Sequence, residues 1–156
     1  MEIERKFLVD KLLWQKEKSL NYDRIIQAYL STDIKKSIRL RIKNDEKAIM
    51  TIKGKKQGIS GEEIEFDIPI DKAKELIEKF DLPTIKKNRY TNYFNGKKWE
   101  VDEFYGDNEG LIIAEIELQS ENEIFDLPPW IKDEVSYDAR YFNSYLSQNP
   151  YKSWKK

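Results

Sequence analysis

The first nine residues alternate between charged and apolar side chains, and this pattern constrains the fold more than any other feature of the chain. Glu2, Glu4 and Lys6 are two residues apart, while Ile3 and Phe7 fall in the opposite phase. Successive side chains of a β-strand point to opposite faces, so the charged groups share one face and the apolar groups share the other. Taken alone, the segment predicts a half-exposed edge strand with its charges in water.

Later segments repeat this alternation, and most of them carry charges of one sign. Residues two apart on a strand lie on the same face, so each pair places like charges side by side. The acidic pairs are Glu2/Glu4, Glu63/Glu65, Glu100/Asp102 and Glu115/Glu117, and the basic pairs are Arg39/Arg41 and Lys87/Arg89, with Lys6 and Lys53 in phase. Because like charges repel, this repetition in one small domain favours a shared role over chance.

Most of the chain has the length and alternation of β-strands, and few helices are indicated. The expected strands span residues 2–9, 22–31, 37–43, 47–53, 62–68, 84–95, 97–104 and 111–118. Helices are expected at 71–80, capped by Asp71, and at 138–146, capped by Asp138. A short helix and a turn are expected within 119–133, and the tail 149–156 is expected to be frayed or peripheral. Asn95-Gly96 fits a type I′ hairpin turn. The predicted class is α+β, mainly β, an antiparallel barrel or sandwich that forms a single domain over residues 1–156.

Two arrangements can bury the apolar faces of these strands. In an ordinary barrel or sandwich the charged pairs face the solvent, and their cross-strand ion pairs contribute little. In the inverse arrangement, an eight-stranded antiparallel closed barrel carries the charges in a central tunnel, and a few flanking helices and loops cover its apolar outside. Such a tunnel must hold water, because removing an unpaired ion from water costs several kcal/mol. Spacing by itself leaves both arrangements open.

Composition excludes several kinds of chemistry. The 156 residues include no histidine, which removes imidazole metal sites and histidine-dependent nucleophiles. They include no cysteine, consistent with a reducing compartment, and no apolar run long enough for a signal or a membrane span. A net charge of -1 and a pI of about 5.7 argue against a general nucleic-acid binder. We therefore expect a cytoplasmic protein without nucleic-acid or membrane partners.

A tunnel with both signs of charge suits a polyanion accompanied by metal ions. Arg39 and Arg41 present planar guanidinium groups that can hold phosphate oxygens with two hydrogen bonds. Lys6, Lys53 and Lys87 would act as point charges. The carboxylate pairs offer only oxygen ligands, which favours a hard divalent cation such as Mg²⁺ or Mn²⁺ bridging to the phosphates.

The order of these motifs resembles that of a known family. Glu2-x-Glu4-x-Lys6 is similar to the ExExK signature of the CYTH, or triphosphate tunnel metalloenzyme, superfamily. The other matching motifs are Arg39-x-Arg41, Thr51-Ile52-Lys53, Glu63-x-Glu65, Lys87-x-Arg89-Tyr90, Glu100-Val101-Asp102, Glu115-x-Glu117 and the segment from Glu134 to Asn143. The resemblance covers about residues 2–146, which is nearly the whole chain.

The resemblance implies a tunnel that binds a triphosphate group together with Mg²⁺ or Mn²⁺. The residues implied to bind the triphosphate are Lys6, Arg39, Arg41, Lys53, Lys87 and Arg89. The residues implied to hold metal are Glu2, Glu4, Glu115 and Glu117, with Glu63, Glu65 and Asp102 near them. Glu2, Glu4 and Lys6 form the expected catalytic group, in which Glu2 or Glu4 orients the attacking water. Tyr29 is interpreted as a buried aromatic side chain, with closure of the tunnel as its alternative role.

The expected reaction is metal-dependent hydrolysis of inorganic triphosphate to pyrophosphate and phosphate, because the chain resembles the stand-alone bacterial triphosphatases of the family. The motifs do not define the reaction, since similar folds hydrolyse thiamine or nucleoside triphosphates and some act as adenylate cyclases. Trp14 and Trp99 could stack on an organic group, but core packing is the preferred interpretation. A non-catalytic polyphosphate-binding module is the alternative from another class, and the acidic pairs argue against it. A homodimer is left open.

Overall fold

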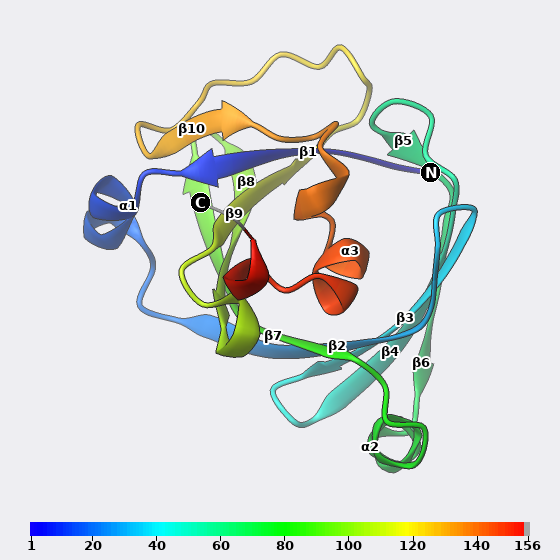
Figure 1. Ribbon diagram of the computed structural model, residues 1–156. Coiled ribbons are helices and arrows are strands. Elements are labelled where there is room, and N and C mark those ends of the chain that lie inside the picture. Colours follow the sequence, from blue (N-terminus) through cyan, green and yellow to red (C-terminus); the bar gives the residue numbers. More distant parts are fainter. Residues whose placement is uncertain (155–156) are drawn as a thin grey trace.

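Residues 1–154 are described by the computed structural model, which consists mainly of antiparallel strands (Figure 1). The strands are β1 (Glu2–Val9), β2 (Tyr22–Asp33), β3 (Lys36–Lys43), β4 (Lys47–Gly54), β5 (Ser60–Gly61), β6 (Glu63–Ile68), β7 (Thr84–Phe94), β8 (Lys97–Tyr105), β9 (Ile112–Glu117) and β10 (Ile131–Glu134). The α-helices are α1 (Lys11–Glu17), α2 (Ile70–Lys79) and α3 (Asn143–Gln148), and the 3₁₀ helices are η1 (Gly106–Asn108), η2 (Ala139–Tyr141) and η3 (Tyr151–Ser153). The predicted class, α+β and mainly β, is confirmed.

The sheet curves around a central space but does not close into a barrel. Its strands lie in the order β10-β1-β9-β8-β7-β2-β3-β4-β6, and β5 pairs with the start of β1. Beyond Ile3, the remaining edge of β1 is occupied: the Glu4 N–H donates to Ile59, and the Lys6 carbonyl accepts from Val135. No ladder therefore joins β6 to β1 within the described chain. The predicted closed eight-stranded barrel is not confirmed. A closed barrel would need a ladder between β6 and β1, and the two-residue β5 pairs with β1 at that place instead.

The apolar faces of the strands point outward, as the inverse arrangement requires, and most of them are covered, although Ile64 and Phe66 of β6 are 67% and 47% exposed. Over β1, β8 and β9, the ring centroid of Trp130 lies 4.8 Å from that of Trp14 and 6.0 Å from that of Trp99. Trp14 and Trp99 are fully buried, so they are core residues, as preferred from the sequence. Over β2, β3 and β4, Ala73 of α2 packs with Leu40 in a second outer cluster.

The C-terminal segment fills one end of the central space. Leu146 of α3 is buried against Ile85, Phe104 and Ile113, which continue the inward faces of β7, β8 and β9. In Figure 1, α3 lies inside the curve of the sheet. The inward surface is therefore apolar at this end and charged over the rest of its length.

Two helix predictions differ from the structure in detail. Helix α2 is preceded by Pro69 as its N-cap, so Asp71 lies within the first turn instead of capping it. The single helix expected over residues 138–146 is divided, because Phe142 has an extended backbone between η2 and α3. Asp138 does act as a cap, with its side chain accepting a hydrogen bond from the N–H of residue 140.

Two further local predictions are wrong. Residues 119–133 include two consecutive prolines that cannot donate backbone hydrogen bonds, and the segment forms turns and the start of β10 instead of a helix. The tail is not wholly peripheral, because Trp154 packs edge-on against Tyr141 with ring centroids 5.3 Å apart. The last part of the predicted tail, residues 155–156, lies outside the described residues. No described helix has the length and apolar character needed to span a membrane.

Shortening Leu146 is expected to destabilise the fold, because its side chain is 1% exposed and fills the apolar end of the central space. Leu146→Ala should lower the free energy of unfolding by about 2–5 kcal/mol in urea denaturation. Leu20→Ala is the matched control, since Leu20 is 96% exposed, and it should change that free energy by less than about 0.5 kcal/mol. Equal effects of the two substitutions would contradict the docking of α3.

Candidate active site

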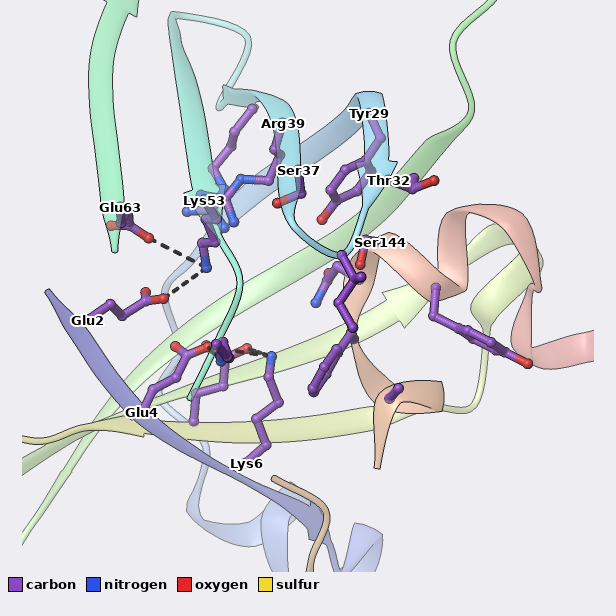
Figure 2. A pocket seen from close by; sticks show the side chains of 18 of the residues that line it. Glu2, Glu4, Lys6, Tyr29, Thr32, Ser37, Arg39, Lys53, Glu63 and Ser144 are labelled. Atoms are coloured by element: carbon purple, nitrogen blue, oxygen red, sulfur yellow. Dashed lines mark hydrogen bonds and ion pairs between the residues drawn. The ribbon is translucent and has the colours of Figure 1, made fainter. Parts of the chain in front are cut away.

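The concave face of the sheet surrounds a cavity of about 600 Å³, and Figure 2 shows the charged side chains that line it. The predicted site residues that line it are Glu2, Glu4, Lys6, Arg39, Arg41, Lys53, Glu63, Glu65, Lys87, Arg89, Glu115 and Glu117. They come from six strands, and residues of the C-terminal segment complete the wall. The structure thus brings the two signs of charge together in one cavity, with Asp102 as the one predicted residue that does not line it.

Lys6 lies between two carboxylates at the junction of β1 and β9. Its Nζ atom is 3.0 Å from Glu115 Oε1 and 3.8 Å from Glu4 Oε1, and all three side chains are nearly buried. Burial opposes the charge of Lys6, but Glu115 and Glu4 raise its pKa above the ordinary value. Burial raises the pKa of Glu4, and the carboxylate of Glu115 raises it further. The cluster is therefore held together by one ammonium group shared between two acids.

Lys53 forms a second shared contact where β4 faces the start of β1. Its Nζ atom is 2.9 Å from Glu2 Oε1 and 3.4 Å from Glu63 Oε2, as the dashed lines in Figure 2 show. Lys53 lies directly opposite Glu63 in the β4–β6 ladder. Burial by itself would raise the pKa of Glu2, but Lys53 lowers it below the ordinary value. Burial raises the pKa of Glu63, with a further contribution from Glu2.

Arg39 is only partly satisfied by its neighbours. Its Nη2 atom donates to Thr51 Oγ1 at 3.1 Å and lies 3.6 Å from Glu65 Oε2. Thr51 and Glu65 are in register with Arg39 across β3, β4 and β6, and Thr51 donates in turn to Glu65 at 2.9 Å. The buried Nε atom of Arg39 has no hydrogen-bond partner within residues 1–154. A buried donor without an acceptor is costly, so this position favours an incoming oxygen atom.

Asp102 lies behind the cavity and neutralises two of its cations. Its side chain is 1% exposed, its oxygens accept hydrogen bonds from Arg89 Nε at 2.8 Å and Arg89 Nη2 at 2.9 Å, and its Oδ2 atom forms an ion pair with Lys87 Nζ at 2.8 Å. Burial opposes its ionisation, but Arg89 and Lys87 lower the pKa of Asp102 to about 2. Burial lowers the pKa of Lys87 to about 7, although Asp102 acts in the opposite direction. With both oxygens engaged, Asp102 is better suited to holding Lys87 and Arg89 in place than to binding metal.

Several lining residues were not singled out from the sequence. Lys56, from the glycine-rich loop after β4, is 3.5 Å from Glu4 Oε1. The ring of Phe142 lies 5.5 Å from Lys56 Nζ and 5.9 Å from Lys6 Nζ, and Asn143 Oδ1 accepts from Lys87 Nζ at 2.9 Å. Loop residues have no periodicity that would assign them to a face of the sheet, so the sequence pattern did not indicate that Lys56 lies near the cavity. Asn143 belongs to the matching segment from Glu134 to Asn143, but the sequence assigned it no role in the site.

The donor set of the cavity fits a hard divalent cation. Carboxylates are the only acidic ligands that the chain offers, and oxygen-only sets favour cations such as Mg²⁺. Within the described part of the chain, no three acidic residues converge tightly enough to form a ready-made metal site. Instead, Lys6 and Lys53 each lie between two carboxylates. A metal ion bound between these carboxylates would require the ammonium groups to move away from them.

Comparison with known proteins assigns the family. A family model described as the CYTH domain matches residues 1–143. The chain belongs to the CYTH domain family. This CYTH-domain protein is 47% identical over 156 residues to an inorganic triphosphatase of Acetivibrio thermocellus, with coverage of 99% of this chain and 97% of its relative. It is 33% identical over 150 residues to an inorganic triphosphatase of Nitrosomonas europaea, with coverage of 94% and 96%.

The fold of this CYTH-domain protein also resembles that of a solved relative. The TM-score to the crystal structure of an inorganic triphosphatase is 0.67, at 32% sequence identity and 94% coverage of each chain. The family resemblance inferred from the charged motifs is therefore confirmed by sequence and by structure.

Removing the charge of Asp102 is expected to destabilise the protein even without metal, because buried Lys87 would lose its ion-pair partner and buried Arg89 would lose the closest of its three carboxylates. Asp102→Asn should lower the free energy of unfolding by about 3–5 kcal/mol, measured by urea denaturation in EDTA. Asp67→Asn is the control: the Asp67 side chain is 74% exposed and 3.9 Å from Lys47, so its loss should cost less than about 1 kcal/mol. A loss of stability that appears only with divalent metal would instead make Asp102 a metal ligand.

Proposed function

We propose that this CYTH-domain protein is a metal-dependent inorganic triphosphatase that splits inorganic triphosphate into pyrophosphate and phosphate. The observation that carries the proposal is the single cavity in which guanidinium and ammonium groups face carboxylates. The names of the relatives support the same reaction, including one that is 47% identical over nearly the whole chain. Phosphate binding alone needs only the basic groups, so the accompanying carboxylates favour hydrolysis over passive binding.

The basic part of the site is proposed to bind the triphosphate. The residues concerned are Lys6, Arg39, Arg41, Lys53, Lys87 and Arg89. Arg39 and Arg41 are two apart on β3 and line the cavity together. The unsatisfied Nε atom of Arg39 supports this role, because a phosphate oxygen would supply the acceptor that the protein lacks there.

The acidic part of the site is proposed to hold the metal. The carboxylates concerned are Glu2, Glu4, Glu63, Glu65, Glu115 and Glu117. A divalent cation bound by such groups would neutralise phosphate charge and make water more acidic. Asp102 was part of the set expected from the sequence, but its contacts with Lys87 and Arg89 favour a supporting role.

Glu4 is our choice over Glu2 for orienting the attacking water. Glu2 Oε1 already accepts a 2.9 Å hydrogen bond from Lys53. The ammonium groups nearest to Glu4 Oε1 are farther away, with Lys56 at 3.5 Å and Lys6 at 3.8 Å. Glu4 therefore has more freedom to accept a hydrogen bond from water, while Lys6 is close enough to hold a phosphate oxygen beside it.

The remaining details of the proposal come from the sequence. They are Mg²⁺ or Mn²⁺ as the metal, a cytoplasmic location, one domain over residues 1–156 and a small triphosphate as the partner, without nucleic-acid or membrane partners. A homodimer is left open.

The proposed reaction predicts phosphate release from inorganic triphosphate that depends on divalent metal. Purified protein should be assayed with inorganic triphosphate, ATP and thiamine triphosphate, each in Mg²⁺, Mn²⁺ and EDTA. We expect the highest kcat/KM for inorganic triphosphate and loss of turnover in EDTA. Formation of cyclic AMP from ATP would favour the cyclase alternative, and tight binding without turnover of any triphosphate would favour a binding module.

Substitutions in the two halves of the site should separate binding from turnover. Arg39→Ala should raise the KM for inorganic triphosphate about tenfold or more, because it removes a charged two-point donor. Glu117→Ala should mainly lower the metal-dependent kcat. Arg24→Ala is the matched control for arginine, since Arg24 is exposed and does not line the cavity. Equal, negligible effects of the two site substitutions would contradict these roles.

A further inference from the structure

Gln27 is a fully buried polar residue that was not assigned any role from the sequence. It lies on β2 directly opposite Arg41 of β3, with an exposure of 0%. Its Oε1 atom accepts two hydrogen bonds from Arg41, from Nε at 3.0 Å and from Nη2 at 2.7 Å. One edge of the Arg41 guanidinium group is thus held by a single carbonyl oxygen.

Arg41 differs from the other basic residues of the site in its lack of a counterion. The residues Lys6, Lys53, Lys87, Arg39 and Arg89 each have a carboxylate within 4.0 Å. Arg41 has no carboxylate within that distance in the described chain. Its guanidinium group instead donates two hydrogen bonds to Gln27. Burial, together with repulsion from Arg39 and Arg89, lowers the pKa of Arg41 to about 10. The protein therefore maintains an enclosed positive charge without an adjacent neutralising group.

The orientation of the Gln27 amide follows from hydrogen-bond chemistry. Arginine only donates, so the carbonyl end of the amide must face Arg41. The NH₂ end lies 3.4 Å from Tyr29 Oη and 3.4 Å from Asn143 Oδ1, both of which can accept. Asn143 Oδ1 also accepts from Lys87 Nζ at 2.9 Å. Neutral amides therefore contact two cations of the cavity at positions where a carboxylate of the same shape would fit.

A glutamate at position 27 would present a carboxylate to the same edge of Arg41. The contact would then join two opposite charges, whereas in the Arg41–Gln27 contact only the donor is charged. The ion pair would stabilise the empty cavity, since a partly buried charge without a partner is costly. It would also cancel the charge that attracts a polyanion. The amide provides the geometry of this contact without its neutralising charge.

We propose that Gln27 is a positioning residue that fixes the guanidinium group of Arg41 while leaving its full positive charge for the triphosphate. This role rests on the proposed function, because it assigns Arg41 to the substrate. A merely structural Gln27 would affect stability and substrate binding in the same direction. If Gln27 preserves the charge of Arg41, replacing it by glutamate should maintain or raise stability while it weakens substrate binding.

The test compares Gln27→Glu, which keeps the shape and adds a charge, with Gln27→Met, which removes the acceptor without adding one. Stability is measured as the thermal midpoint, and binding as the Kd for inorganic triphosphate by calorimetry in EDTA at about pH 8, where a glutamate beside arginine is ionised. We expect Gln27→Glu to melt at or above the wild-type temperature but to bind at least about tenfold more weakly. Gln27→Met should melt below the wild type and bind better than Gln27→Glu.

Gln148→Glu is the matched control for the added charge. Gln148 is exposed, lines the same cavity and makes no described contact with Arg41, so its replacement should weaken binding by less than about threefold. Gln27→Glu with unchanged affinity, or with affinity and melting temperature both reduced, would overturn the inference. Wild-type protein that binds inorganic triphosphate in EDTA but does not hydrolyse it when Mg²⁺ or Mn²⁺ is supplied would overturn the proposed function alone. Wild-type protein that does not bind it would overturn both.

Discussion

The structure depends on balancing charge across neighbouring strands. Like charges two residues apart on one strand repel each other, and several of them are balanced by the opposite sign on a neighbouring strand, although Glu4 faces Glu117. Lys6 lies opposite Glu115 in the β1–β9 ladder, and Lys53 lies opposite Glu63 in the β4–β6 ladder. Strand register therefore controls the electrostatics of the cavity, and a shift by one residue would move the charges to the apolar outer face.

An inward charged face requires a covered outer face. The tryptophan cluster around Trp14 and Trp130 covers one side of the sheet, and α2 covers another. The C-terminal segment has a different role, because Leu146 fills the apolar end of the lumen while Phe142 and Asn143 contact lysines of the charged part. The segment that completes the packing thus also completes the candidate site.

The cations of the cavity are neutralised to different degrees by their neighbours. Asp102 neutralises Lys87 and Arg89 from behind, so these groups stay positioned when the cavity is empty. Arg41 is held by the neutral Gln27, and Arg39 keeps one buried donor without an acceptor. The least compensated groups, Arg39 and Arg41, are two residues apart on β3, which is why we propose this strand as the main anchor for a polyanion. Leaving these groups unsatisfied lowers the stability of the empty protein in favour of binding.

The sequence alone predicted eight of the ten strands, which charged residues share a face of each strand, and the family, because strand periodicity and residue order are local properties. It also predicted the Asn95-Gly96 turn, where both residues have the positive φ that a type I′ turn requires. Only the tertiary structure decided that the sheet stays open, that Asp102 lies behind the cavity, and that Gln27 and Lys56 belong to its surroundings. Periodicity assigns a side chain to a face, but distances between facing strands and loops depend on how the sheet curves and on which neighbours occupy its edges.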